Sequence, residues 1–498
     1  MSERERSFAS PLKWAFAMNW GDRAMSTIFT FVLAAMLGPH DFGVVAVALI
    51  YIVLIELVLE GGVQTALVQR EDLNDAHLSS AFWLNLAWCV ALAGVSYLLA
   101  PWWARLNEEP ELTNVVRSLS VLLIFSGLTI VQVAIFQRTL NFKGLAIREN
   151  VAVLVGGVLG ITLALQGAGV WALVAQQVGF AATKLILLWG MSTWRPSFSF
   201  SRGHARDLVG FSSGVFFANL GGFLNRRSDA LLIGIFFEPA TVGVYRLADR
   251  FVDNVLSLTM RPVAHVSLPA FSRLQADRAA LRASVASFMR TSLVTTVPLM
   301  FVMAACSSHL IALMGEEWTD TADVLRILAV VGIGKAIVFF TGPLLFAVGR
   351  PHLRAVMLWV LAALAAGTVI VTGVLLTDAA SRTQALGMAG SRALFFLAIV
   401  IPANVAVICW LTGMRPRSML PWLVSPFASG AAAVAAVALL EASGVLGLIG
   451  EFGALLLTGT AATAAAGGVL YALEPRVREV ASPLLRKALR RGKGAAEA

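Results

Sequence analysis

Apolar segments of about 20 residues follow one another along almost the whole chain, separated by short polar connections. This length is what an α-helix needs to cross the hydrocarbon core of a bilayer, where only helices and closed barrels satisfy every backbone hydrogen bond. The chain is 58% hydrophobic and only 13% charged, so too few polar side chains exist to cover such a surface in water. The sequence predicts an all-α, polytopic membrane protein.

Hydropathy windows predict about fourteen transmembrane helices. The expected spans lie near 12–37, 42–66, 79–101, 115–137, 148–166, 170–190, 208–237, 241–264, 287–306, 323–348, 353–376, 385–411, 420–441 and 447–473. They predict an N-terminal lobe of six helices over 1–191, a cytoplasmic linker over 192–207, a second six-helix lobe over 208–412, two further helices in 413–474 and a basic cytoplasmic tail over 475–498.

A short motif occurs twice, at a constant offset. The segment GPHDFGV at 38–44 is answered by EPATVGV at 238–244, and in the same register Asn19 pairs with Asn219. In each copy a long apolar segment ends at a Pro-containing turn. Such internal repeats are a common build of secondary transporters, whose substrate site lies between the halves. The repeat therefore predicts two pseudo-symmetric lobes.

Basic residues alternate from one side of the membrane to the other, as the positive-inside rule requires. With the N-terminus in the cytoplasm, the outer connections are acidic or neutral, except for Arg105 and Arg382. We therefore expect both termini in the cytoplasm. The inner connections then carry Arg70, Arg138, Lys143, Arg195, Arg202, Arg206, Arg273, Arg278, Arg282, Arg350, Arg415 and Arg417, followed by the tail.

Several classes of function are disfavoured. The net charge of +9 is spread over connections and tail, which suits membrane topology better than nucleic-acid binding. Cys89, Cys306 and Cys409 lie far apart without metal-ligand spacing, and no phosphate-binding loop is present, so we expect no cofactor. The longest connections, 102–114 and 271–288, are too short for a folded catalytic domain, so we expect no enzyme.

Ionisable residues inside spans are costly and therefore candidate functional groups, and most lie in the first two helices of each predicted lobe. They could line a cationic cavity for an anionic substrate, or form structural pairs such as Arg226 with Asp229 and Arg250 with Asp253. Glu56 and Glu60, one turn apart, could couple transport to ions or pair with a neighbouring Arg. The residues expected to face the substrate are Arg23, Arg226, Arg227, Arg246, Arg250 and Lys335.

Several stretches are similar to the Wzx-like polysaccharide transporters of the multidrug/oligosaccharidyl-lipid/polysaccharide flippase superfamily, the branch with colanic-acid and succinoglycan exporters. They are LGPHDFGVVAVA at 37–48, EGGVQTALVQREDLNDAHLSSAFWLNL at 60–86, FQRTLNFKGLAIREN at 136–150, GFSSGVFFANLGGFLNRRSDALLIGIFFEPATVGVYRLADRFVD at 210–253 and LPAFSRLQAD at 268–277. The last third of the chain agrees in hydropathy alone.

The resemblance implies a bilobed bundle of fourteen helices around a central cavity, in the bacterial inner membrane. It implies a flippase that moves undecaprenyl-diphosphate-linked oligosaccharide by alternating access for exopolysaccharide or lipopolysaccharide biosynthesis. Its partners would be that substrate, membrane lipids, and the polysaccharide polymerase and export machinery. The alternatives are a lipid II flippase, an ion-coupled drug exporter of the same superfamily, which would need an acidic cavity, and a membrane-embedded sugar transferase.

Overall fold

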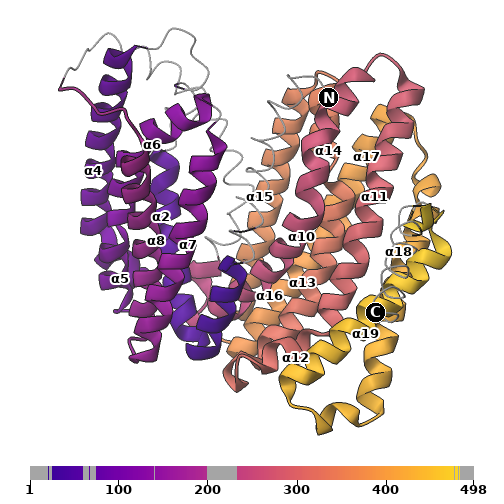
Figure 1. Cartoon of the computed structure of the whole chain (residues 1–498). Helices are drawn as coiled ribbons and strands as arrows, with labels where there is room; N and C mark the ends of the chain where they lie inside the picture. The colour runs from indigo at the N-terminus through magenta and orange to yellow at the C-terminus, as the bar shows by residue number, and fades with distance from the viewer. Residues whose placement is uncertain are drawn as a thin grey trace, which may run out of the picture. The chain divides into compact units, whose positions relative to one another are not determined.

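The computed structural model describes residues 21, 25–59, 67, 74–139, 141–198, 233–475, 477–479 and 482. Within these ranges all regular structure is helical and no residue lies in a strand (Figure 1). The predicted all-α class is confirmed for this part of the chain.

The helices follow one another with short connections. In order they are α2 (Pro39–Leu59), α4 (Asp75–Leu106), α5 (Leu112–Leu119), α6 (Val121–Arg138), α7 (Phe142–Leu165), α8 (Val170–Met191), α10 (Pro239–Arg273), α11 (Arg278–Ala305), α12 (Ser307–Ala312), η1 (Glu316–Trp318), α13 (Thr319–Val338), α14 (Thr341–Ala347), α15 (Pro351–Leu376), α16 (Ser381–Phe395), the π-helical turn η2 (Phe396–Val400), α17 (Ile401–Thr412), η3 (Pro416–Met419), α18 (Pro421–Ala442), η4 (Val445–Leu448) and α19 (Glu451–Leu473).

Eleven membrane-spanning candidates occur within the described residues, each at a predicted span, so the polytopic membrane class is confirmed. A shorter apolar helix, Met25–Met36, lies in the first predicted span. The helix α10 is not among the eleven, because charges interrupt its first half, from Arg246 to Asp253. Most of the span predicted at 208–237 lies outside the described residues. The count of fourteen stays a prediction.

The connections expected at 102–114 and 271–288 are shorter than predicted. The helix α4 continues to Leu106, and α10 reaches Arg273 before α11 begins at Arg278. Asp277 caps α11, since its carboxylate accepts from the backbone N–H groups of Ala279 and Ala280 at 2.9 and 3.0 Å. Hydropathy detects only the apolar part of a helix, so it misses polar turns that extend beyond the hydrocarbon core.

The chain groups into two compact units. One contains the described residues up to Arg246 together with Leu358–Ala385, and the other contains Leu247–Met357 and the described residues from Leu386 onward. The helices α10, α15 and α16 each contribute to both units. The predicted lobe boundaries at 191, 207 and 412 stay predictions.

In the first unit, α6, α7 and α8 pack around an apolar layer in which Phe136, Leu145 and Leu188 are buried together. Gly144 allows the close approach of α7 to α6, because a Cβ atom there would lie 2.6 Å from the Phe136 ring. Figure 1 shows these helices in the violet part of the chain. This layer fixes the register of the three helices. It therefore also sets the positions of the polar residues that lie one helical turn away from it.

The two repeated turns also pack against each other in the first unit. A Cβ atom on Gly43 would overlap the carbonyl group of Pro239, and one on Gly243 would overlap the carbonyl oxygen of Pro39. Only residues without a side chain allow the N-terminal turns of α2 and α10 to approach so closely. Thr241 then binds the first turn of α16 (Ser381–Phe395), where its hydroxyl donates to Gln384 Oε1 at 3.0 Å.

In the second unit, α10, α11, α14 and α17 share an apolar core around Phe271, Phe340 and Ile408, each fully buried. The helices α18 and α19 pack on each other and on α11. Glu474, directly after α19, is 1% exposed and accepts from Arg290 at 3.0 Å and from Ser425 at 3.1 Å. This buried carboxylate joins the end of α19 to α11 and α18.

Candidate functional site

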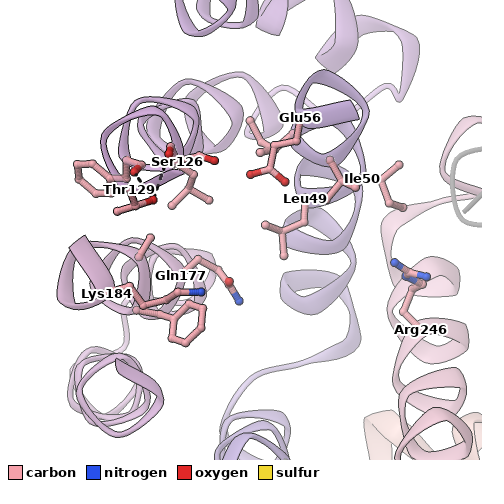
Figure 2. Close-up of a pocket in the computed structure, with 14 residues that line it drawn as sticks. Leu49, Ile50, Glu56, Ser126, Thr129, Gln177, Lys184 and Arg246 are labelled. Atoms are coloured by element: carbon pink, nitrogen blue, oxygen red, sulfur yellow. Dashed lines mark hydrogen bonds between the residues drawn. The ribbon is translucent and has the colours of Figure 1, made fainter. Parts of the chain in front are cut away.

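A cavity of about 420 Å³ opens within the first unit between α2, α6 and α8, with α10 contributing one side chain (Figure 2). Among the described residues, its wall combines aliphatic and aromatic side chains with six polar or charged ones. The lining residues are Leu49, Ile50, Ile52, Val53, Glu56, Leu122, Phe125, Ser126, Thr129, Gln177, Phe180, Ala181, Lys184 and Arg246. A volume of this size is in the range of about 300–1,000 Å³ that is typical of small-molecule sites.

Apart from Arg246 on α10, the polar groups come from three different helices and point toward a common space (Figure 2). Glu56 extends from α2, Ser126 from α6, and Gln177 and Lys184 from α8. Within the described residues the side chains of Ser126 and Gln177 make no hydrogen bond. Thr129 is different, because its hydroxyl donates to the backbone oxygens of Phe125 and Ser126 and can only accept from a ligand.

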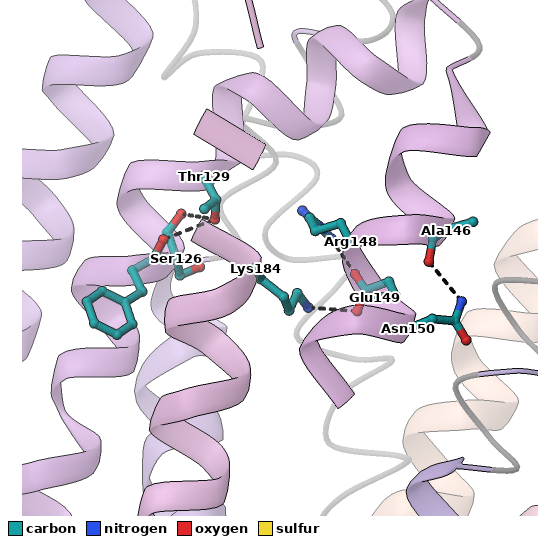
Figure 3. A network of polar contacts seen from close by, with 8 residues as sticks. Ser126, Thr129, Ala146, Arg148, Glu149, Asn150 and Lys184 are labelled. Carbon is teal, nitrogen blue, oxygen red and sulfur yellow. Dashed lines mark hydrogen bonds and ion pairs between the residues drawn. The ribbon is translucent and has the colours of Figure 1, made fainter. Parts of the chain in front are cut away.

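Lys184 is held in place from the α7 side. Its ammonium lies 3.2 Å from a carboxylate oxygen of Glu149 and 4.7 Å from the centre of the Phe180 ring. The other carboxylate oxygen of Glu149 accepts from Arg148, which is 7% exposed (Figure 3). The three charged groups form one chain, with Lys184 at the pocket end.

Helical register explains why these groups meet. Glu149 follows Leu145 by one turn on α7, and Lys184 precedes Leu188 by one turn on α8. Gln132 precedes Phe136 by one turn on α6, is fully buried, and has no hydrogen-bond partner for either amide atom within the described chain. Residues four apart share a helix face. The polar layer of Gln132, Glu149 and Lys184 therefore lies one turn from the apolar layer of Phe136, Leu145 and Leu188.

Of the residues expected to be functional, two line this cavity: Glu56 and Arg246. Arg246 faces it from α10 and makes no ion pair within the described residues. Arg23, Glu60, Arg226 and Arg227 lie outside the described residues. Their expected roles stay predictions.

The remaining two, Arg250 and Lys335, belong to the second unit. Lys335 donates to Asp253 at 3.0 Å, and Arg250 is exposed on α10. Asp249 lies 3.6 Å from Arg392. The carboxylate of Asp253 therefore has a cationic partner on α13, Lys335. The pairing of Asp253 with Arg250, which the sequence spacing suggested, stays a prediction.

Sequence reasoning did not single out Lys184, Glu149, Arg148, Gln177 or Ser126. A lone lysine within the span predicted at 170–190 is a signal that could have identified Lys184, because ionisable residues in membrane helices are rarely without a function. Gln177 and Ser126 gave no such signal, since polar uncharged residues are common in membrane helices.

The side chains that line the cavity do not form a set of metal ligands. Within the described residues, no group of three or more His, Cys, Asp and Glu side chains could hold a metal ion. The cavity offers hydroxyl, amide, ammonium and carboxylate groups on an apolar wall. Such a surface can bind a polar ligand through hydrogen bonds and exclude bulk water around it.

A polytopic helical bundle with a polar pocket enclosed by its membrane helices is the architecture of a membrane transporter. The family model described as "Polysaccharide biosynthesis protein" matches residues 32–323, more than half of the chain. The protein belongs to this polysaccharide biosynthesis family.

Three known proteins are similar to the chain in amino-acid sequence. The succinoglycan biosynthesis transport protein ExoT of Rhizobium meliloti (strain 1021) is 29% identical over 64% of this chain and 64% of its own length. The teichuronic acid biosynthesis protein TuaB of Bacillus subtilis (strain 168) is 29% identical over 60% and 62%, respectively. The lipopolysaccharide biosynthesis protein WzxC of Escherichia coli (strain K12) is 24% identical over 70% and 72%. The match thus spans less than two thirds of the first two proteins.

Solved structures show the same fold. The lipid II flippase MurJ in an inward closed conformation superposes with a TM-score of 0.71 at 14% identity, covering 92% of this chain and 99% of that one. A multidrug resistance MATE family transporter in an inward-facing conformation gives a TM-score of 0.58 at 15% identity, covering 79% and 96%. At these identities the likeness shows the fold and not the substrate.

Proposed function

We propose that this protein is a flippase that moves undecaprenyl-diphosphate-linked oligosaccharide units across the bacterial inner membrane by alternating access. The units would serve exopolysaccharide or lipopolysaccharide biosynthesis. The observation that carries the proposal is membership of the polysaccharide biosynthesis family over residues 32–323, in a chain with eleven apolar candidate spans among its described helices.

The described pocket supports this proposal physically. A lipid-linked sugar has a headgroup that hydrocarbon excludes and a tail that hydrocarbon favours. The cavity gives such a headgroup hydrogen-bonding partners at membrane depth, on α2, α6 and α8, while the tail remains in the bilayer. The cations that we assign to the diphosphate are Arg23, Arg226, Arg227, Arg246, Arg250 and Lys335, and Glu56 or Glu60 is the proposed ion-coupling group.

The proposal includes location and partners. Both termini would be cytoplasmic, which places Arg138, Lys143 and the basic tail on the inner side. The lipid-linked oligosaccharide is the proposed substrate, and a polysaccharide polymerase with its export machinery would receive the product. No observation specifically favours the lipid II or drug-export alternatives, since MurJ and the MATE transporter share only the fold with this chain.

Complementation tests the proposal. The gene is expressed in cells whose own oligosaccharide flippase has been deleted, with glycan systems from several sources, and surface glycan is measured together with membrane levels of the protein. Restored surface glycan in one of these systems supports a flippase. Normal insertion without restoration in any system contradicts the proposal.

A further inference from the structure

Arginine side chains gather at one end of the second unit, beside Trp410 in the last turn of α17. Arg278, at the start of α11, donates to the backbone oxygen of Trp410 at 3.0 Å. The guanidinium group of Arg350 lies over the Trp410 ring, 4.5 Å from its centre. Arg354 follows Arg350 by one helical turn, and its backbone N–H donates to the Arg350 oxygen at 3.4 Å. The end of α17 and the starts of α11 and α15 thus bring three positive charges close to one exposed aromatic ring.

These cations have no counter-charge in the described part of the chain. None of Arg278, Arg350 and Arg354 forms an ion pair with a described carboxylate. The carboxylate of Asp277 accepts instead from two backbone N–H groups of α11. Arg354 is half-buried, because its guanidinium group lies against Gly342 on α14, where a Cβ atom would be 3.4 Å from Nε. A cation that is partly withdrawn from water costs free energy unless an anion compensates it.

These cations lie at the level of a bilayer where lipid headgroups are found. Arg354 is in the first turn of the candidate span formed by α15, and Trp410 is in the last turn of α17, where another candidate span ends. Tryptophan at the end of a membrane helix is typical of the headgroup level. Exposed apolar side chains lie in the neighbouring turns, since Phe346 on α14 is 53% exposed and Val356 on α15 is 59% exposed. A ligand that meets all of these groups has an anionic head and an apolar tail.

We propose that the surface formed by Arg278, Arg350, Arg354 and Trp410 binds the phosphodiester headgroup of an anionic phospholipid from the surrounding bilayer. Arg350 and Arg354 present planar forks of donors to the phosphate oxygens. The Trp410 ring holds the first of these forks in place, and Arg278 adds positive charge beside it. The acyl chains remain in the hydrocarbon next to the exposed apolar side chains.

The position of the cations favours a phospholipid over the diphosphate of a transported lipid. Arg350 and Trp410 are exposed at the ends of their helices, and bilayer headgroups surround such positions at all times. This inference goes beyond the proposed function, and it does not depend on flippase activity.

Lipid-dependent stability tests the surface. The full-length protein is purified in dodecyl maltoside, and its unfolding temperature is followed during titration with dioctanoyl-phosphatidylglycerol or dioctanoyl-phosphatidylcholine. The two lipids have the same chains and differ in the charge of the headgroup. We expect tighter binding of the phosphatidylglycerol, which should raise the unfolding temperature at lower concentrations because it binds the folded state. Arg354→Gln should weaken that binding about tenfold, the loss of one hydrogen bond to a charged group.

The matched control is Arg282→Gln, which removes an exposed arginine from the same end of α11. It should bind phosphatidylglycerol as the wild type does, whereas a diffuse basic surface predicts equal losses for the two variants. Without added lipid, Arg354→Gln should unfold at or above the wild-type temperature, because the change removes a partly buried charge that has no counter-charge. A lower unfolding temperature would show that Arg354 is already compensated by the chain, and would overturn the proposal.

Two further outcomes would also overturn the proposal. One is equal affinity for the two phospholipids, which would show that the headgroup charge is not recognised. The other is found by adding undecaprenyl diphosphate as a competitor. If it binds more tightly than phosphatidylglycerol and loses the same affinity in Arg354→Gln, the surface belongs to the transported lipid. Complementation is a separate measurement, so failure of the flippase proposal and failure of this one are distinguishable.

Discussion

The ammonium of Lys184 on α8 lies 3.2 Å from a carboxylate oxygen of Glu149 on α7, so a lysine that faces the pocket is held from the α7 side by a partly buried carboxylate. Arg148 contacts the other oxygen of that carboxylate. The single carboxylate therefore compensates two cations in the interior of the first unit, and its removal affects both stability and the pocket.

Glu149→Gln should destabilise the protein by about 1–3 kcal/mol, because the buried Arg148 and the partly buried Lys184 would lose their counter-charge. Thermal unfolding of the purified protein measures the change. The control is Asp323→Asn, which weakens the more exposed pair of Asp323 with Arg326 and should cost about 0–1 kcal/mol. Equal decreases in unfolding temperature for the two variants would show that the Lys184–Glu149 contact stabilises the protein no more than an exposed ion pair does.

Gly43→Ala should destabilise the first unit, although the same change in the middle of a helix normally stabilises by about 0.5–1 kcal/mol. The reason is the added Cβ, which would overlap the carbonyl of Pro239 at the turn–turn contact. Gly94→Ala in α4 is the control, since no atom lies within 4 Å of a Cβ there. A lower melting temperature for the first variant and an unchanged or higher one for the second are expected. The reverse order would contradict the close approach of α2 and α10.

Glu474→Ala should loosen α19 from α11 and α18, because Arg290 and Ser425 would lose their shared acceptor. We expect a loss of about 1–3 kcal/mol, since Glu474 is 1% exposed. Limited proteolysis of the C-terminal segment, read by mass spectrometry, reports the loosening. The control is Glu317→Ala, which changes an exposed carboxylate. An unchanged cleavage pattern in Glu474→Ala would show that Glu474 does not anchor α19 on α11 and α18.

Arg226→Ala combined with Arg227→Ala should abolish transport at normal membrane levels of protein, if these residues meet the diphosphate as proposed. Removing two cations from one site lowers the attraction for a multiply charged anion far more than it changes folding. Surface glycan in the flippase-deleted strain is the readout. Surface glycan at the wild-type level would show that Arg226 and Arg227 are not needed for transport and have a structural role.

Much of the fold was predictable because membrane helices are long and apolar. The spans expected at 79–101 and 353–376 lie within α4 and α15, and the span expected at 420–441 differs from α18 by one residue at each end. Hydropathy could not reveal the breaks inside spans, such as Ser120 between α5 and α6. Breaks of this kind arise from local backbone geometry and packing, and leave no gap in apolarity.

The candidate site was predictable only in part. Charge inside an apolar span identified Glu56 and Arg246, which line the pocket. Ser126 and Gln177 become visible only when α6 and α8 are packed, because their position depends on the register set by Phe136 and Leu188. Gln132 likewise becomes notable only through its complete burial without a partner in the described chain.

Direct translocation by the purified protein is the closest test of the proposed flippase activity. The protein is reconstituted into liposomes that carry a fluorescent undecaprenyl-diphosphate-linked oligosaccharide of a glycan system that it complements, and the fraction of fluorophore accessible to a membrane-impermeant quencher is followed with time. The flippase proposal predicts that inner-leaflet fluorophore becomes accessible faster with the protein than in protein-free liposomes, and no faster than in protein-free liposomes with the Arg226→Ala, Arg227→Ala double variant. An accessible fraction that stays at the protein-free value, despite correct insertion, would contradict it.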